Sequence, residues 1–128
     1  MEHNKYFSLE EARTTLPAII VKLERMMKLK KSLDERGYDI RRHQYFGGMG
    51  PNGTGKFPAD MEELVELVRE IAGEGIIIKS VDDGLIDFPH IRSCGEEVYL
   101  CYKLGEDGIE FWHGIYDGFS GRRSVEEL

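Results

Sequence analysis

Cysteine, proline and tryptophan are scarce in this 128-residue chain, which holds two, four and one of them, respectively. Two cysteines, Cys94 and Cys101, are too few for a disulfide framework or a four-thiolate zinc site, and we expect both to be reduced thiols. No apolar run approaches the roughly 20 residues that span a bilayer, and the first residues lack the basic-then-apolar pattern of an export signal. We therefore expect a cytoplasmic protein without a membrane segment.

Basic residues are also in the minority, because 17 Lys and Arg face 24 Asp and Glu, which gives a net charge of −7. They concentrate in residues 22–42, with eight Lys and Arg against four acids, whereas residues 44–128 hold seven against seventeen. A basic stretch can bind nucleic acid or another anion. Here it is interleaved with apolar positions and the overall sign is wrong for a duplex, so a solvated helix face is favoured and no nucleic-acid partner is expected.

The first predicted element is a long helix. Ser8 and Glu11 form a capping box, and apolar residues recur at helical intervals from Leu9 to Leu33. The helix is expected to end near residue 36, or near residue 43 if Gly37 is tolerated. Such a long, narrow apolar stripe usually needs a partner helix.

A second helix is predicted to supply that partner. Asp60 and Glu63 indicate another capping pair, and the apolar stripe that follows ends at Gly73 or Gly75. The two helices are expected to form an antiparallel hairpin over about residues 9–73.

Residues 47–58 are expected to form a glycine-rich connection between these helices. Within it, residues 50–56 match the first seven positions of the phosphate-binding pattern G-x-x-x-x-G-K. The pattern next requires Ser or Thr, whose hydroxyl binds magnesium, and Phe57 stands there instead. It also needs a preceding strand, whereas a helix precedes it here. A linker is therefore favoured over a nucleotide site.

From residue 76 the apolar period changes to the alternation typical of strands. Four strands are expected, over residues 76–81, 85–88, 97–104 and 109–115, with Pro89 ending the second and a two-residue turn at Asp107-Gly108 joining the last two. The predicted fold class is α+β: a long antiparallel helical hairpin, a four-stranded antiparallel meander over about residues 76–116, and an irregular tail over 117–128. With 41% apolar residues, the chain is expected to form a single domain over residues 1–128.

Two polar residues interrupt the apolar strands. Asp87 is flanked by apolar residues, and a buried carboxylate is costly unless Arg122, Arg123 or His113 pairs with it. With the two-residue turn, His113 falls on the apolar face opposite Tyr102. Both residues could brace the fold or form a site for a metal ion or ligand, and the sequence leaves these alternatives open.

Cys101 would complete a Cys–His metal or nucleophile pair in only one strand register. The two-residue turn places it on the sheet face opposite to His113, and we favour this register because it keeps the apolar residues together. A three-residue turn would reverse the parity and bring the two residues together. His90 and Cys94 have the spacing for a metal on one helical turn, but the proline and glycine that bracket them leave room for a short helix only.

The remaining polar candidates lie in a loop and in the tail. Glu106 is expected in the hairpin loop with a solvated side chain. Arg122 and Arg123 lie in a flexible segment, where they could clamp a carboxylate or phosphate ligand or fold back on Asp87.

Several segments occur together in a recognisable order: YFSLEEA (6–12) with LP (16–17), GLIDFP (84–89), VYLCY (98–102), LGE (104–106), WH (112–113) and GFSGR (118–122). This combination resembles a bacterial family known as domain of unknown function 2203, over most of the chain except the central loop. The resemblance implies a bacterial or archaeal cytosolic protein with a long helical hairpin, and it implies no activity. The recurrent polar residues of the family pattern fall here on Asp87, Cys101, Glu106, His113 and Arg122.

Two functions are predicted from these features. The favoured one is a non-enzymatic interaction module that forms a homo-oligomer through the long first helix, with the polar cluster as a brace, so enzyme activity is not expected. The alternative is a metal- or small-ligand-binding protein, with hydrolysis as one activity it could support. Its ligand-binding residues would be Asp87, Glu106, His113 and Arg122, with Asp87 and His113 as the metal ligands. No cofactor is evident from the sequence; a divalent metal ion belongs to the alternative, and its small-molecule ligand is not identified.

Overall fold

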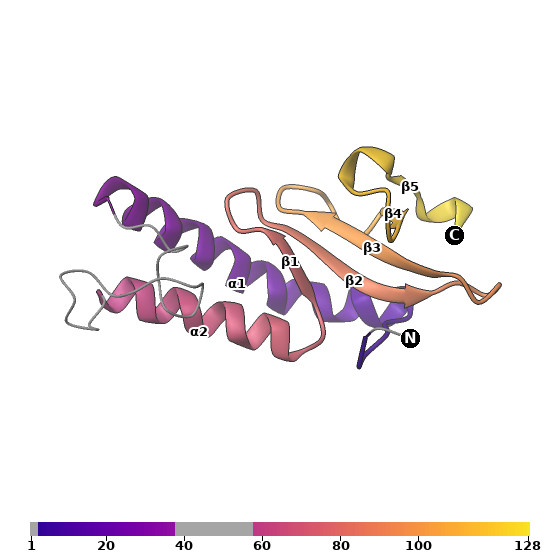
Figure 1. The fold of residues 1–128 in the computed structure, drawn as a ribbon, viewed down its shortest axis with the longest axis horizontal. Coiled ribbons are helices and arrows are strands. Elements are labelled where there is room, and N and C mark those ends of the chain that lie inside the picture. Colours follow the sequence, from indigo (N-terminus) through magenta and orange to yellow (C-terminus); the bar gives the residue numbers. More distant parts are fainter. Residues whose placement is uncertain (1–2, 38–57) are drawn as a thin grey trace.

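The computed structural model of the chain describes residues 3–37 and 58–128. Its elements are helices α1 (Leu9–Glu35) and α2 (Ala59–Gly73), strands β1 (Ile77–Ser80), β2 (Leu85–Ile91), β3 (Glu97–Lys103), β4 (Phe111–Gly114) and β5 (Arg123–Ser124), and the short 3-10 helices η4 (Phe119–Gly121) and η5 (Val125–Glu127). The strands form one antiparallel sheet in the order β1-β2-β3-β4-β5 (Figure 1). The α+β class and the meander are confirmed, with five strands in place of four.

Helix α1 begins as the sequence predicts. The backbone N–H of Glu11 donates to the Ser8 hydroxyl at 3.0 Å, and the Ser8 N–H donates to the Glu11 carboxylate at 3.1 Å. These two bonds satisfy amides that the first helical turn leaves without an internal partner. The helix ends at Glu35, before Gly37 with its φ of 81°, so the shorter of the two predicted ends is correct.

Helix α2 begins differently from the prediction. Its N-cap is Pro58, which makes no side-chain capping bond, so the capping pair predicted at Asp60 and Glu63 is wrong. Asp60 lies in the first turn and turns toward α1, where its carboxylate accepts from Arg36 at 2.9 Å and from Ser32 at 3.3 Å. A contact between helices therefore takes the place of the cap.

The two helices pack side by side and run in opposite directions. Successive ion pairs join later positions of α1, and finally its C-cap Arg36, to earlier positions of α2: Lys22–Glu70, Arg25–Glu63 and Arg36–Asp60. The connection predicted over residues 47–58, including the phosphate-loop-like segment at 50–56, lies outside the described residues except for Pro58. The hairpin connection therefore stays a prediction. None of the described helices combines the length and the apolar character that a membrane crossing requires.

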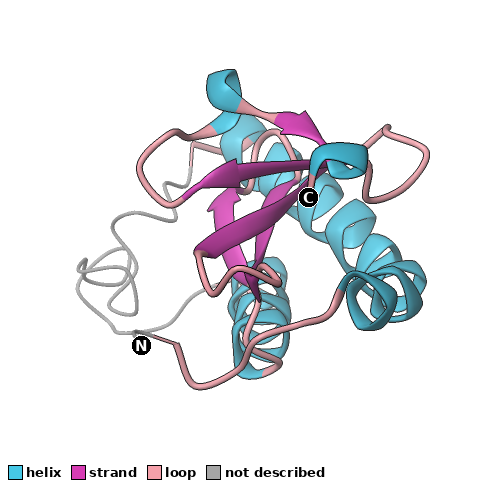
Figure 2. Ribbon diagram, turned by 90° about the vertical axis from the view of Figure 1, so that its right-hand side faces the viewer, coloured by secondary structure: helices cyan, strands magenta, loops and turns pink. Residues whose placement is uncertain are grey.

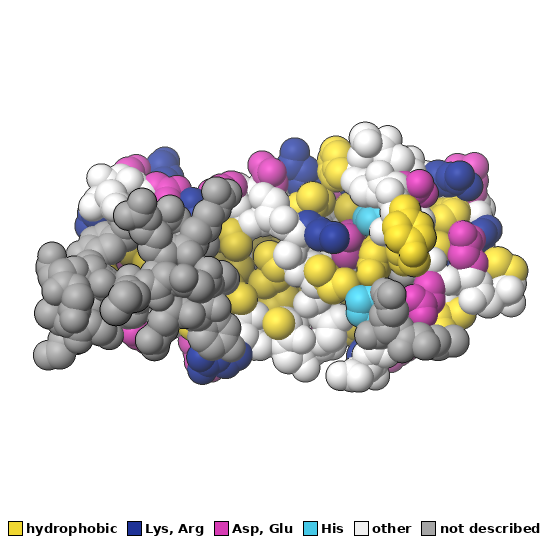
Figure 3. Space-filling model, in the orientation of Figure 1, with side chains coloured by type: hydrophobic (Ala, Val, Ile, Leu, Met, Phe, Trp, Pro, Cys, Tyr) yellow, Lys and Arg dark blue, Asp and Glu magenta, His cyan; other side chains and the backbone are white. Residues whose placement is uncertain are grey.

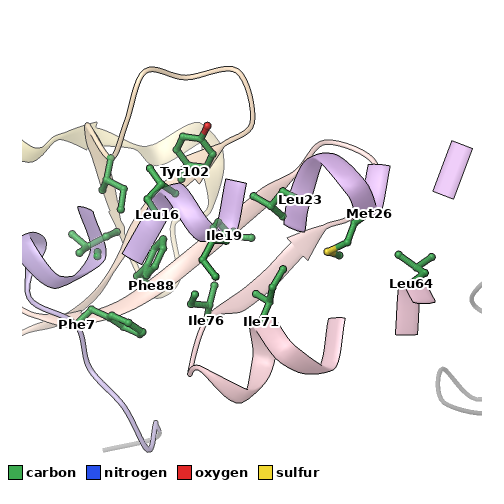
Figure 4. Close-up of a cluster of buried hydrophobic side chains, with 14 of the residues drawn as sticks. Phe7, Leu16, Ile19, Leu23, Met26, Leu64, Ile71, Ile76, Phe88 and Tyr102 are labelled. Carbon is green, nitrogen blue, oxygen red and sulfur yellow. The ribbon is translucent and has the colours of Figure 1, made fainter. Parts of the chain in front are cut away.

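The core lies between the helices and one face of the sheet. The buried face of α1 carries Ala12, Leu16, Ile19, Leu23, Met26, Leu29 and Leu33. Even-numbered strand residues meet this stripe, among them Ile86, Phe88, Leu100, Tyr102 and Trp112. Figure 4 shows α1, α2 and sheet side chains converging, and Figure 2 shows both helices on the same side of the sheet. The odd-numbered residues of the central strands therefore face away from the helices.

Strand β2 continues through Pro89 to Ile91, so the prediction that Pro89 ends it is wrong. The carbonyl of Pro89 accepts from the Phe7 N–H at 2.7 Å, on the edge of β2 that faces away from β3. In an antiparallel strand the nitrogen of a residue points to the same edge as its carbonyl. The missing N–H of Pro89 therefore costs no hydrogen bond to β3, and a proline at such an edge position is tolerated.

The predicted irregular tail contains regular structure. β5 pairs with β4, joining Phe111 to Ser124 and Trp112 to Arg123. The Trp112 indole N–H donates to the Ser124 carbonyl at 2.9 Å, which fixes the tail to the sheet. This pairing explains the fifth strand.

Candidate metal centre

The register between β3 and β4 decides which polar residues meet. Tyr99 pairs with His113 and Cys101 with Phe111, so the predicted pairing of Tyr102 with His113 is wrong by three residues. Because side chains alternate between the two faces of a strand, a shift by an odd number of residues moves every β4 side chain to the opposite face of the sheet. Cys101 and His113 therefore share the face that points away from the helices.

The loop between β3 and β4 explains this shift. It spans residues 104–110 and is not a two-residue turn at Asp107-Gly108. Ile109, which was predicted to begin the strand, lies in this loop instead and is only 1% exposed. Its carbonyl accepts two hydrogen bonds from Arg13. The loop is organised around Glu106, whose carboxylate accepts from the Lys103 N–H at 2.7 Å and whose carbonyl accepts from the Tyr102 hydroxyl at 3.2 Å.

Three neighbouring strands place Asp87, Cys101 and His113 together on this face. Asp87 on β2 lies directly across from Cys101 on β3, and His113 on β4 lies one diagonal step away. One potential ligand atom from each residue lies within 4.8 Å of the other two. The residues are 0%, 1% and 3% exposed, respectively. Figure 3 shows histidine, basic and acidic side chains next to one another among hydrophobic ones over the sheet.

Both ring nitrogens of His113 have partners. Nε2 lies 3.1 Å from each carboxylate oxygen of Asp87, and Nδ1 lies 2.8 Å from the carbonyl oxygen of Gly114. Since a carbonyl only accepts, Nδ1 carries a proton. A neutral ring would then present the Nε2 lone pair to a carboxylate, which is repulsive. The geometry therefore requires a proton or another cation between Nε2 and Asp87.

A turn after β4 holds the Gly114 carbonyl in place. The Asp117 N–H donates to that carbonyl at 3.1 Å, and the Asp117 carboxylate accepts from the Gly114 N–H at 3.1 Å. The turn thereby fixes the acceptor that orients His113. This role could not be predicted from the sequence, because the residue types of a solvent-exposed turn do not indicate which carbonyl contacts a histidine.

The environment shifts the pKa values of His113 and Cys101. Burial alone would lower the pKa of His113, but its hydrogen bonds to Asp87 and Gly114 and the charge of Asp87 raise it overall, against the opposing charge of Lys79. Burial, followed by the charge of Asp87, raises the pKa of Cys101 to about 12, while Arg122 opposes this rise. A thiol of this kind is a poor nucleophile, since the reactive form is the thiolate.

Glu106 and Arg122 form an adjacent pair. Arg122 Nη1 lies 3.0 and 2.9 Å from the two Glu106 carboxylate oxygens. The side chain of Glu106 is only 18% exposed and that of Arg122 only 14%, so the prediction of a solvated Glu106 is wrong. Of the three partners predicted for Asp87, His113 is the one that pairs with it. Arg123 is exposed and stacks on Trp112 at 5.3 Å.

His90 and Cys94 do not form the metal pair that their spacing suggested. His90 lies in β2, where its Nδ1 lies 2.7 Å from the Phe7 carbonyl oxygen, and no helix forms between the two residues. Cys94 is an exposed thiol in the following turn. Both cysteines are free, as predicted.

The fold and the cluster define a class: a two-layer α+β protein whose sheet carries a buried Asp–Cys–His cluster on the face away from its helices. The chain belongs to the family described as "Uncharacterized conserved protein (DUF2203)", whose family model matches residues 5–125. No curated protein and no solved structure matches the chain. The predicted family is thus confirmed, and its description brings no activity with it; bacterial origin stays a prediction.

Proposed function

We propose that the protein binds a divalent transition-metal ion, best matched by Zn²⁺, through Asp87, Cys101 and His113. Carboxylate oxygen, thiolate sulfur and imidazole nitrogen are the ligand types of zinc sites. The observation that carries the proposal is the orientation of His113, with Nδ1–H bonded to a backbone carbonyl and Nε2 directed into the cluster. Metal-binding histidines usually have this arrangement, because the second hydrogen bond fixes the tautomer that can ligate.

The distances suit such an ion. Zinc at 2.0–2.3 Å from each ligand holds tetrahedral ligand atoms roughly 3.5 Å apart. Nε2 of His113 already lies 3.1 Å from Asp87, and Cys101 completes a group within 4.8 Å. Small side-chain rotations would bring the three atoms around one centre, and a fourth position would be left for water or a small ligand.

Charge balance also favours a divalent ion. Without metal, the Asp87 carboxylate and the His113 imidazolium cancel, and Cys101 is a neutral thiol. With a dication, a carboxylate and a thiolate cancel its two charges and the imidazole is neutral. Both states avoid the cost of a net charge in a buried place, because the ion replaces two protons. A reduced thiol is required, which agrees with the predicted cytoplasmic location.

Thiol catalysis fits the geometry less well. A nucleophilic cysteine needs a base that takes its proton, yet one ring nitrogen of His113 is directed at Asp87 and the other at Gly114. The other competing interpretation is a structural brace without a metal, in which the His113 imidazolium stays paired with the Asp87 carboxylate.

Metal titration separates these interpretations. Protein produced without a histidine tag is treated with a chelator and titrated with Zn²⁺ and with Co²⁺, whose thiolate complexes absorb in the near ultraviolet. We expect one ion per chain and a thiolate-to-cobalt band, both lost in Cys101→Ser and in His113→Gln.

The matched control is Cys94→Ser, which removes the exposed cysteine and should leave stoichiometry and band unchanged. Wild-type protein that takes up no ion, or a band that survives in Cys101→Ser, would refute the metal proposal and leave the brace.

The predicted interaction module stays a prediction. Its main support was the long apolar stripe of α1, which is buried within the chain against α2 and the sheet. Among the described residues, the exposed large hydrophobic side chains are Val21 in α1, Tyr116 in the turn after β4 and Phe119 in η4. Light scattering of the purified chain tests the homo-oligomer directly.

A further inference from the structure

The guanidinium group of Arg122 is fixed by three contacts, two with aromatic rings and one with a carboxylate. Its guanidinium lies 4.2 Å from the Phe111 ring centroid and 4.0 Å from that of Phe119, and its Nη1 contacts both oxygens of Glu106. Glu106 is itself fixed by the backbone N–H of Lys103 at 2.7 Å. Two aromatic contacts and an ion pair therefore define the position and the plane of one guanidinium group.

This position is beside the proposed ligand Cys101. Phe111 pairs with Cys101 across β3 and β4, so the ring that carries Arg122 is the immediate neighbour of the cysteine. The guanidinium over the Phe111 ring therefore lies on the sheet face that carries the Cys101 side chain. Because Nη1 is engaged by Glu106, the other N–H groups of the planar fork are those available to the sulfur.

The chemistry of the pair is complementary. A thiolate that ligates a metal keeps lone pairs that accept hydrogen bonds, and a guanidinium stays charged at any physiological pH. Groups in the outer shell of a metal site orient the ligands and tune their electron density.

We infer that Arg122 is a positioning residue of the metal centre, which donates an N–H hydrogen bond to the Cys101 thiolate while Glu106 and two phenylalanine rings hold it in place. The inference rests on the proposed function, since it assigns the outer shell of that same centre. It gives Glu106 and Arg122 a role that acts through Cys101, without direct contact with the ion.

Cobalt-loaded Arg122→Met tests this role. Methionine keeps a long apolar side chain between the two rings but has no N–H donor. A hydrogen bond stabilises the sulfur lone pairs, so its loss should move the thiolate-to-cobalt band to longer wavelength. We also expect Co²⁺ and Zn²⁺ affinity to fall about 10–100-fold, as is typical when an outer-shell partner is removed.

Arg123→Met is the matched control, because it makes the same change one residue along the chain, where the arginine stacks on Trp112. Its band and affinity should equal those of the wild type. If Arg122→Met does not fold, Glu106→Gln takes its place. Loss of the ion pair that holds Arg122 is expected to shift the band in the same direction as Arg122→Met would, but by a smaller amount.

The outcomes separate the two proposals. If wild-type protein binds no Co²⁺, the metal proposal fails and this inference fails with it. If wild-type protein and Arg122→Met bind Co²⁺ with the same band and the same affinity, the role of Arg122 is refuted while the metal site stands.

Discussion

At the scale of single residues, the pairing of Asp87 with His113 is the most consequential contact in the sheet. Both side chains are almost fully buried, and their nearest atoms are 3.1 Å apart. Removing one partner of a buried charged pair leaves the other without compensation, which typically costs about 3–5 kcal/mol. Each partner therefore depends on the other in the metal-free fold, whatever else the cluster does.

We predict that Asp87→Ala lowers the free energy of unfolding of chelator-treated protein by about 3–5 kcal/mol, measured by urea denaturation. The exposed Asp107 provides the control, since Asp107→Ala should stay within about 0.5 kcal/mol of wild type. Equal stability of the two variants would mean that His113 finds another partner or is neutral in the native state.

At the scale of elements, the turn from Gly114 to Asp117 links an exposed aspartate to the buried cluster. In Asp117→Ala the Gly114 N–H loses its acceptor, so the turn that holds the His113-orienting carbonyl keeps only its backbone bond from residue 117. We expect a loss of about 0.5–1.5 kcal/mol in stability and about a 10-fold weaker zinc affinity, measured by competition with a chelator. Asp117→Asn keeps an acceptor oxygen and should restore most of the affinity; a variant Asp117→Ala with unchanged affinity would contradict the role of this turn.

The elements also show what the sequence could predict. The capping box at Ser8, the apolar stripe of α1 and the alternation in the strands depend on local spacing, so they were predictable from the chain alone. The register of β4 depended on whether Ile109 would leave its strand to fill the core, which is a tertiary event. For that reason Asp87 and His113 were identified as candidates while Cys101 was wrongly placed on the other face.

The contribution of Glu106 was hidden for a similar reason. Its residue type and its loop position suggested a solvated side chain, and only the path of the tail brings Arg122 to it. Tail segments without strong periodicity give little indication of where they return to the sheet. The fifth strand was missed on the same grounds.

At the scale of the whole molecule, pH should act in opposite directions on the metal-free and metal-loaded protein. Burial opposes the charge on His113, but Asp87 and Gly114 raise its pKa overall. A group with a raised pKa in the native state stabilises fully below its unfolded value, about 6.5, and this contribution is lost as pH rises through the native pKa. Metal binding has the reverse dependence, because protons compete for His113 and Cys101.

We therefore expect chelator-treated protein to lose stability as the pH rises above about 6.5, while the additional stability conferred by zinc grows with the same rise in pH. Urea denaturation at several pH values, with and without zinc, measures both. In His113→Gln the metal-free slope should flatten and the zinc effect should vanish. If the free energy of unfolding changes with pH in the same way with and without zinc, a centre in which the ion replaces protons is contradicted.

The loop over residues 104–110 makes the centre sensitive to chain length. Strand faces alternate with every residue, so removing or adding one residue there would shift β4 by one position unless the loop absorbed the change. His113 would then point into the helical core, and its place beside Asp87 would be taken by Trp112 after an addition or by Gly114 after a removal. Such a chain would keep nearly its whole composition and lose the cluster entirely. Among relatives of this protein, the number of residues between the third and fourth strands should therefore be as diagnostic of a working centre as the ligand residues themselves.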